Sequence, residues 1–325
     1  MKEKPVFSVI IPSVGNTNIY KTICSVILQT FNDFEILIVF DGDNTQYIST
    51  LLRELASHEK IEIFKNFRDK GGNGARNSGI LKAKGQYICF LDDDDIWHKD
   101  RLERVLPFLK GSDDSMAGCI TGFNYWNGKE LQKHSIIESK EMAREFLLQA
   151  YNFGNSSNFI LKKEAISTIG LWDENLKRHQ DYEYFLRILR YFKLLAVNEV
   201  LLTINGHSTQ PSSEVMLKSK INYFYSIKDY LHGMTPAEND QFFGKQYHEL
   251  LTQTTSEGRL YSSLSIIKKI LRKKNYRLSS YQLLKIYFKI LLFPLFRIRF
   301  ILHKKYSVRL FYKRKFKNAY KFNLI

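Results

Sequence analysis

Cysteine is scarce in this sequence, and its three cysteines stand far apart. Cys24, Cys89 and Cys119 are odd in number and lie in apolar stretches. This spacing gives no sign of a disulfide framework or of a zinc site. We therefore expect reduced thiols and a cytoplasmic setting. The first apolar run, Val6 to Ile11, is also too short for the core of a secretory signal.

Two common nucleotide-binding motifs are missing as well. The chain has no Walker A lysine pattern, and Gly72-Asn73-Gly74 lacks the third glycine of a dinucleotide-binding loop because Asn77 stands at that position. Hydride transfer and phosphate-loop NTPase chemistry are therefore excluded. We interpret the glycines as allowing close backbone approach before Arg76. Arg76 is predicted to face a nucleotide, and the alternative is an ordinary surface arginine.

Acidic residues are absent from the last part of the chain. Glu257 is the last of 33 Asp and Glu residues, whereas 19 of the 49 Lys and Arg residues follow it. The net charge of +16 therefore belongs to a basic extension on a nearly neutral body. We predict one domain over residues 1–210 and a helical, strongly basic C-terminal extension over residues 211–325.

No long uncharged apolar run occurs in this extension. Lys289, Pro294, Arg297 and Arg299 interrupt its most apolar part, which argues against a membrane-crossing helix. Apolar and basic residues alternate there, and a Lys or Arg near an anionic membrane surface gains about 1 kcal/mol. Peripheral binding to the inner face of the cell membrane is one expectation. Packing on the rest of the chain or on a second copy is the other.

The hydrophobic pattern of the first hundred residues alternates between strand and helix periods. Apolar runs predict strands at Val6–Ile11, Glu35–Phe40, Ile61–Phe64 and Gln86–Leu91. Helical spacing predicts helices from Ile19, from Ile48 and over 75–83. The fold class is therefore α/β, with a mostly parallel sheet covered by helices on both faces.

Polar residues follow three of the predicted strands. Pro12-Ser13, Asp41-Gly42-Asp43 and Asp92-Asp93-Asp94-Asp95 come directly after apolar runs. Open α/β sheets bind ligands beyond the carboxyl ends of their strands, so these groups are expected to meet at one edge. The pattern predicts a site for a nucleotide-sized ligand with a bound metal.

Four consecutive carboxylates repel one another unless a cation compensates them. In an extended segment, Asp92 and Asp94 would project to one side and Asp93 and Asp95 to the other. Carboxylate oxygens suit Mn²⁺ or Mg²⁺. The alternative is a solvated turn in which Asp95 caps a helix that starts near Ile96.

Several motifs together resemble a family 2 glycosyltransferase of the GT-A fold. This family has a Rossmann-like nucleotide-binding sheet, and the resemblance covers roughly residues 6–210. Within it, the chain is similar to bacterial enzymes that build surface polysaccharides such as capsule and O-antigen. The motifs are Phe7-Ser8-Val9-Ile10-Ile11-Pro12, Ser25-Val26-Ile27-Leu28-Gln29-Thr30-Phe31, Phe34-Glu35-Ile36 with Asp41-Gly42, Gly74-Ala75-Arg76-Asn77-Ser78-Gly79-Ile80, and Phe90-Leu91-Asp92-Asp93-Asp94-Asp95-Ile96-Trp97.

The resemblance implies roles for the residues that would bind the donor. Asp41 would hydrogen-bond the base, and Pro12 and Ser13 would line the same pocket. Asp92 and Asp93 would face the ribose and the sugar. The chain departs from the family pattern at Val14-Gly15-Asn16 and at Phe40, where a Tyr-Asn pair and a further aspartate are common.

The resemblance also implies metal and catalytic residues. Asp94 would hold a divalent metal, Mn²⁺ or Mg²⁺, on the diphosphate, and His207 would approach that metal. Asp181 would be the catalytic base that takes the proton of the acceptor hydroxyl. Gln180 replaces the glutamate that usually precedes this aspartate, and Asn205 replaces an arginine of the family's Arg-x-His element.

The implied activity is inverting transfer of a sugar from a nucleoside-diphosphate donor to a hydroxyl of a saccharide acceptor. Uridine diphosphate is the expected carrier, and a lipid-linked acceptor is expected in surface polysaccharide synthesis. Direct displacement needs no enzyme nucleophile. Two alternatives stay open: a sugar nucleotidyltransferase, and a nucleic-acid-binding protein that uses the basic extension.

Overall fold

The computed structural model describes residues 4–15, 19–43, 58–206 and 212–273. Within these residues the packing divides the chain into two units between Phe242 and Phe243, inside helix α10 (Pro236–Ser256). The first unit contains the sheet. The domain boundary predicted near residue 210 stays a prediction, and the helix expected from Ile48 lies outside the described residues.

The sheet of the first unit joins a parallel half to a mixed half. Strands run in the order β3-β2-β1-β4-β8-β6-β9-β5, and β7 pairs with β6. The first four are parallel, β8 is antiparallel to β4, and β9 is parallel to β6. Their bounds are β1 Phe7–Ser13, β2 Phe34–Phe40, β3 Ile61–Lys65, β4 Tyr87–Phe90, β5 Ile96–Trp97, β6 Met116–Trp126, β7 Leu131–His134, β8 Ile160–Lys162 and β9 Lys193–Asn205.

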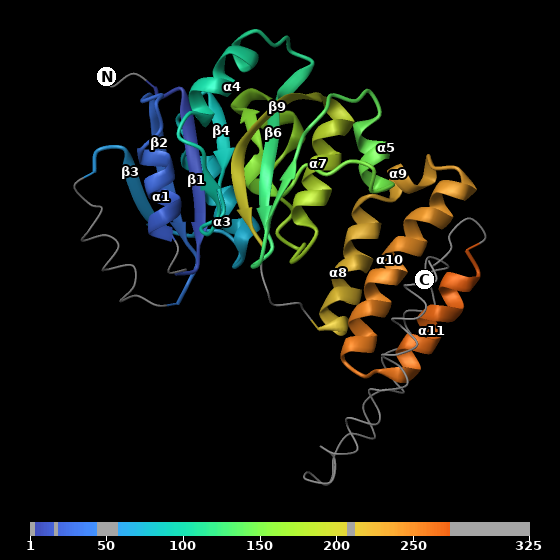
Figure 1. Cartoon of the computed structure of the whole chain (residues 1–325). Helices are drawn as coiled ribbons and strands as arrows, with labels where there is room; N and C mark the ends of the chain where they lie inside the picture. The colour runs from blue at the N-terminus through green and yellow to red at the C-terminus, as the bar shows by residue number, and fades with distance from the viewer. Residues whose placement is uncertain (1–3, 16–18, 44–57, 207–211, 274–325) are drawn as a thin grey trace. The chain divides into compact units, whose positions relative to one another are not determined.

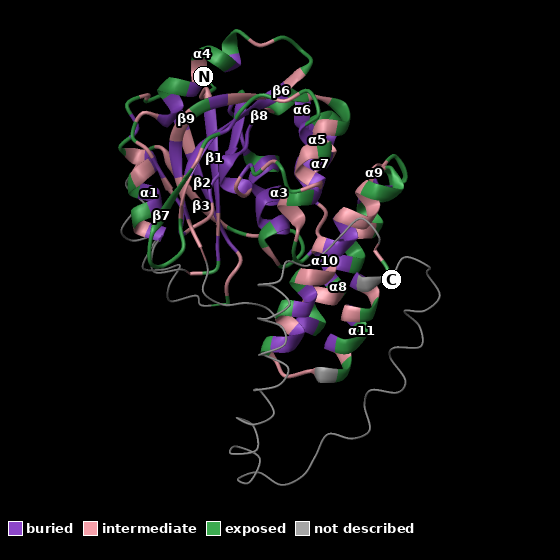
Figure 2. Ribbon diagram, turned by 45° about the vertical axis from the view of Figure 1, so that its right-hand side comes forward, coloured by how far each residue is buried: buried purple, intermediate pink, exposed green. Residues whose placement is uncertain are grey.

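Helices cover both faces of this sheet, as predicted. Figures 1 and 2 show α1 on one face and α3 and α7 on the other. In the first unit the helical bounds are α1 Ile19–Ile27, α3 Gly72–Lys82, α4 Arg101–Lys110, α5 Met142–Leu147, the 3₁₀ helix η1 Ser156–Asn158, α6 Lys163–Ile169, α7 Gln180–Tyr191, α8 Ser213–Ser226 and α9 Lys228–His232.

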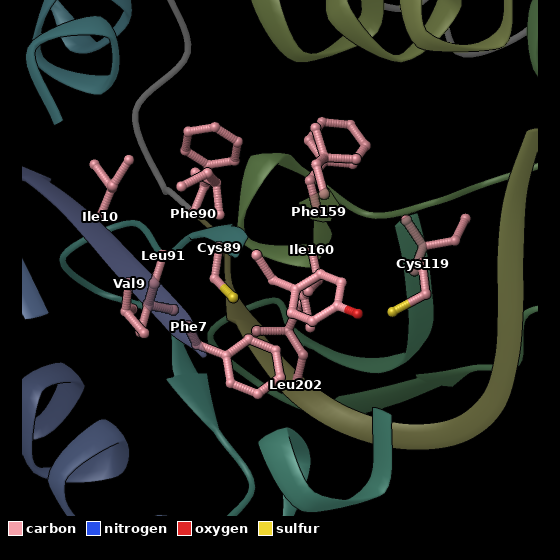
Figure 3. Close-up of a cluster of buried hydrophobic side chains, with 14 of the residues drawn as sticks. Phe7, Val9, Ile10, Cys89, Phe90, Leu91, Cys119, Phe159, Ile160 and Leu202 are labelled. Carbon is pink, nitrogen blue, oxygen red and sulfur yellow. The ribbon is translucent and has the colours of Figure 1, made fainter. Parts of the chain in front are cut away.

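The core lies around the central strands. Every residue of β4 is buried, and β1 and β2 are buried except for Pro12 and Glu35. Figure 3 shows Phe7, Phe90 and Phe159 within this apolar cluster. Cys89 and Cys119 lie in it as free thiols, as expected, whereas Cys24 is exposed. Continuous burial explains why these strands are apolar without alternation.

Helix α3 begins earlier than the sequence indicates. The glycine loop was expected over residues 71–74, yet the helix starts at Gly72, and Ala75 donates its N–H to the carbonyl of Gly71. Gly71 has a φ of 131°, which favours glycine. A Cβ on Gly74 would lie 1.8 Å from the carbonyl oxygen of Asp69. These glycines therefore permit the close backbone approach that was predicted for them.

The second unit continues α10 and adds α11 (Leu260–Leu271). Ser263 of α11 donates to the hydroxyl of Thr254 over 3.1 Å, and Ile266 and Ile270 are buried. Among the described residues, none of the helices combines the length and the apolar character needed to cross a bilayer. The strongly basic segment after residue 273 lies outside the described residues.

Candidate active site

The aspartate run after β4 forms a tight turn. Asp95 donates its N–H to the carbonyl of Asp92 over 3.1 Å. The expectation of an extended segment is therefore wrong, because the backbone reverses within the run. The helix-cap alternative for Asp95 also fails, since Ile96 enters β5 and α4 begins only at Arg101. Each of the four carboxylates consequently has its own surroundings.

Asp92 is paired with a buried arginine. Its Oδ1 lies 2.5 Å from Nη2 of Arg76, which also donates to the hydroxyl of Ser156 over 2.9 Å. Arg76 is 4% exposed, and its guanidinium lies over the ring of Trp172 at 5.0 Å. The surface-arginine alternative is therefore wrong. Among the described residues, Nε and Nη1 of Arg76 have no hydrogen-bond partner.

Asp93 is connected to the end of β1. The hydroxyl of Ser13 donates to Oδ2 of Asp93 over 2.5 Å and accepts the N–H of Gly15 over 3.1 Å. Pro12, which precedes Ser13, is half-buried. The predicted convergence of strand ends is thus confirmed for β1 and β4.

Asp41 extends the same edge to β2. It donates its N–H to the carbonyl of Ser13 over 2.8 Å. Its carboxylate accepts from the side chain of Asn66 at 2.6 Å and from the N–H of Gly71 at 2.7 Å. Asp41 therefore joins β2 to the loop before α3, and its proposed contact with a nucleotide base stays a prediction.

Asp95 points into the protein. It is 1% exposed and accepts from the hydroxyl of Ser157 at 2.6 Å, from the side chain of Asn155 at 2.8 Å and from the N–H of Asn205 at 2.8 Å. Burial raises its pKa to about 7, and the charges of Asp92 and Asp94 add to the rise. These three hydrogen bonds anchor the turn to the interior of the protein.

Asp94 has a raised pKa for the same physical reason. It is 8% exposed, and burial raises its pKa to about 7, with further contributions from the charges of Asp92 and Asp93. The backbone carbonyl of Asp94 accepts a hydrogen bond from the side chain of Asn205. A nearby cation would therefore favour the ionised carboxylate.

Asp181 lies in the first turn of α7, where it accepts the N–H of Tyr182 over 3.0 Å. Burial raises the pKa of its carboxyl to about 6, the charge of Arg76 opposes this rise, and the charge of Asp92 adds to it. The charges of the Arg76–Asp92 pair therefore act on Asp181. The fold therefore places Asp181 near enough to the aspartate turn for the charge of Asp92 to raise its pKa. In the sequence, 86 residues or more separate Asp181 from the turn.

The predicted metal ligands form only part of a site. In the described ranges, no three or more His, Cys, Asp and Glu side chains are grouped so that they could hold a metal by themselves. His207 lies outside these ranges. Asp94 offers the oxygen donors that Mn²⁺ and Mg²⁺ prefer, and burial and the charges of Asp92 and Asp93 raise its pKa. A cation shared with the phosphates of a ligand fits this residue.

Comparison with known proteins identifies the family. Residues 8–170, half of the chain, match the model of "Glycosyl transferase family 2". The chain belongs to glycosyl transferase family 2. Its resemblance to this family, noted from the motifs, is thereby confirmed.

Relatives of this family 2 member come from bacteria and archaea. The amylovoran biosynthesis glycosyltransferase AmsB of Erwinia amylovora is 33% identical over 190 residues, which cover 56% of this chain and 63% of AmsB. An uncharacterized glycosyltransferase of Methanocaldococcus jannaschii is 26% identical over 260 residues, covering 75% of this chain and 86% of that protein. The chain thus spans less than two thirds of the length of AmsB.

Solved structures confirm the GT-A class of fold. TarS of S. aureus, residues 1–349 in complex with UDP-GlcNAc, matches with a TM-score of 0.55 and 15% identity over 83% of this chain and 89% of that 1–349 chain. At this identity the likeness concerns the fold.

Sequence reasoning missed the polar residues that support the aspartate turn of this family 2 enzyme. Ser156 and Ser157 lie in η1 and contact Asp92 and Asp95, while Asn205 ends β9 and holds the turn from the other side. Small polar residues more than 60 positions away give no periodic signal, so only the fold reveals their contact.

The raised pKa values of the turn predict how stability depends on pH. Asp94 and Asp95 bind protons more tightly in the folded chain, so this contribution to stability is complete below the unfolded pKa and is lost as the pH rises through about 7. In metal-free buffer, the free energy of unfolding should fall as the pH is raised from about 4 to about 7 and change little above that, with a slope of at most about 1.4 kcal/mol per pH unit for each group. Urea unfolding at several pH values measures it.

The variant Asp94→Asn isolates one of these groups. Its unfolding free energy should depend less steeply on pH over the same interval, because one titrating carboxyl is gone. Asp114→Asn is the control, because Asp114 is exposed and lies outside the aspartate turn. Its unfolding free energy should depend on pH as steeply as that of the unsubstituted protein. Equal slopes for all three proteins would contradict the assignment.

Proposed function

We propose that this chain is an inverting, metal-dependent glycosyltransferase that moves a sugar from a UDP-linked donor to a hydroxyl of a saccharide acceptor. Family membership supports the reaction class. The observation that carries the proposal is the electrostatic grouping of Asp181, Arg76 and Asp92 beside the aspartate turn. It combines a candidate base with carboxylates suited to a donor and its cation.

Asp181 is the proposed catalytic base. As the acceptor oxygen attacks the anomeric carbon, its proton must be removed, and a carboxylate within hydrogen-bond reach can take it. A pKa of about 6 keeps Asp181 ionised near neutral pH while making it a better proton acceptor than an ordinary aspartate. The N-terminal end of α7 further stabilises its negative charge. Transfer by one direct displacement inverts the configuration of the sugar.

Asp94 is the proposed metal ligand, and His207 is a second candidate. A divalent cation, Mn²⁺ or Mg²⁺, would neutralise part of the negative charge that develops on the departing diphosphate. Asp94 would hold this cation through its carboxylate oxygens. Asp93 and Ser13 would fix the neighbouring backbone through their mutual hydrogen bond.

The proposed donor site lies at the carboxyl ends of β1, β2 and β4. Pro12, Ser13 and Asp41 would line the pocket for the base, and Asp92 and Asp93 would face the ribose and sugar. Arg76 would hold the carboxylate of Asp92 in place through their ion pair. The complex of TarS with UDP-GlcNAc supports a uridine diphosphate carrier, since the two chains share a fold.

The acceptor proposal rests on relatives and on charge. AmsB is named for amylovoran biosynthesis, which supports a role in surface polysaccharide synthesis. We propose a lipid-linked saccharide as acceptor, met at the inner face of the cell membrane. The 19 Lys and Arg residues after Glu257 would attract anionic lipid. Family membership favours this activity over a nucleotidyltransferase or a nucleic-acid-binding protein.

Removing the proposed base should abolish transfer without abolishing donor binding. Asp181→Asn is expected to lower kcat about a hundredfold to ten-thousandfold, the usual contribution of a general base. In the unsubstituted enzyme, kcat/KM should fall as the pH drops below about 6, because Asp181 then becomes protonated. Initial rates of sugar transfer over a pH series, with calorimetric binding of UDP, measure both effects.

Asp229→Asn provides the matched control. Asp229 pairs with Arg190 on an exposed surface at 2.9 Å, so this variant should keep its rate and its pH profile. Near-normal turnover by Asp181→Asn would refute the assignment of the base.

The basic extension should bind anionic lipid. Deleting residues 281–325 removes much of the positive charge after Glu257, so the shortened protein should no longer sediment with phosphatidylserine vesicles. The full chain should sediment with them, less so at high salt, and should ignore neutral phosphatidylcholine vesicles. Unchanged sedimentation of a folded, shortened protein would favour packing of this segment on the rest of the chain.

A further inference from the structure

Arg101 is a fully buried arginine without a carboxylate partner among its described contacts. It begins α4 and is 0% exposed. Its Nη1 donates to the hydroxyl of Thr121 over 2.6 Å, and its Nη2 donates to the side-chain and backbone oxygens of Asn158 at 3.1 and 3.3 Å. Its guanidinium lies over the ring of Trp97 at 5.2 Å. Burying a cation on neutral partners costs stability, so a role other than stability is indicated.

Asn158 connects this arginine to the 3₁₀ helix η1. Its Oδ1 accepts from Arg101 and from the N–H and hydroxyl of Thr121 at 2.9 and 3.0 Å. Its Nδ2 donates to the carbonyls of Thr121 and Phe153 at 2.7 and 2.8 Å. Asn158 is the last residue of η1 and is 0% exposed. Its amide is therefore held from several sides, which fixes the orientation of the short helix.

The two preceding residues of η1 hold the aspartate turn. The hydroxyl of Ser157 accepts the N–H of Asp92 at 2.9 Å and donates to Asp95 at 2.6 Å. The hydroxyl of Ser156 donates to Asp92 at 3.1 Å and accepts from Arg76. Hydrogen bonds thus join Arg101 to the last residue of η1 and the two preceding residues of η1 to the turn, and the backbone of this short helix connects them.

Arg101 also contacts the strand that follows the turn. Trp97 belongs to β5, which follows Asp95 directly and pairs with β9. Asn205, at the end of β9, holds both Asp94 and Asp95. The guanidinium therefore touches elements on both sides of the aspartate run, one through Asn158 and one through Trp97.

We propose that Arg101 is a positioning residue that fixes η1 and β5, and thereby sets the orientation of the Asp92–Asp95 turn for sugar transfer. This inference rests on the proposed function only where its test measures the rate of sugar transfer. Arg101 itself does not touch the donor. Its effect on the rate passes through Ser156 and Ser157, which contact the carboxylates.

The variant Arg101→Met separates positioning from stability. Methionine fills a similar volume without a buried charge, and Oδ1 of Asn158 keeps its two donors from Thr121. We therefore expect a melting temperature close to that of the unsubstituted chain. We expect kcat to fall about tenfold or more, as for other residues that orient the ligands of a site. Arg101→Lys keeps the charge but cannot reach both partners, and should restore part of the rate.

Arg104→Met is the control on the same helix. Arg104 forms an exposed ion pair with Glu199 at 2.6 Å, so its loss should leave kcat unchanged. If Arg101→Met keeps full kcat, the positioning role is overturned. If Arg101→Met does not fold, Arg101→Lys decides: a fall in kcat that the thermal stability of the variant does not explain supports the proposal, and full kcat overturns it.

Amide hydrogen exchange tests the same proposal without any activity. In Arg101→Lys, the peptide containing Asp92 to Asp95 should exchange about tenfold faster than in Arg104→Met, while strand β2 keeps its protection as an internal reference. Equal exchange of the turn peptide in both variants would overturn the proposal. Absence of transfer by the unsubstituted chain with every nucleotide-sugar donor would refute the proposed function alone, and exchange would still decide the role of Arg101.

Discussion

The mutual repulsion of four neighbouring carboxylates is the constraint around which the active-site half of the first unit is organised. Asp92 is compensated by the buried guanidinium of Arg76, Asp93 by the hydroxyl of Ser13, and Asp95 by three donors from η1 and β9. Asp94 keeps a raised pKa. The cation proposed to arrive with the donor would lower this raised pKa and favour the ionised carboxylate of Asp94.

The same electrostatics explain why the candidate base differs from the candidate metal ligand. Burial and the charge of Asp92 raise the pKa of Asp181, whereas the charge of Arg76 lowers it. At Asp94, burial and the charges of both Asp92 and Asp93 raise the pKa to about 7. One carboxylate is thereby suited to proton transfer near neutral pH, and the other to binding an ion. Arg76 of α3 pairs with Asp92 of the turn, and its charge also acts on Asp181 of α7.

The sequence predicts the parallel half of the sheet and the clustering at its edge, because buried strands are continuously apolar and end in polar loops. Ser13 and Asp41 lie side by side for this reason. It does not predict the turn geometry of Asp92 to Asp95, since strand alternation stops where Asp95 bonds back to Asp92. The sequence also does not predict the hydrogen bonds that Ser157 and Asn205 donate to Asp95. These contacts span 62 and 110 positions, and small polar residues so far apart leave no periodic pattern.

A crystal structure of the full chain with UDP and Mn²⁺ is the most direct test of this account. It should show the diphosphate and the metal at the carboxyl ends of β1, β2 and β4, with Asp94 coordinating the ion. Asp181 should face the space that the donor sugar would occupy beside the diphosphate. A nucleotide bound elsewhere, or an Asp181 carboxylate on another face of the sheet from Asp94, would contradict the account.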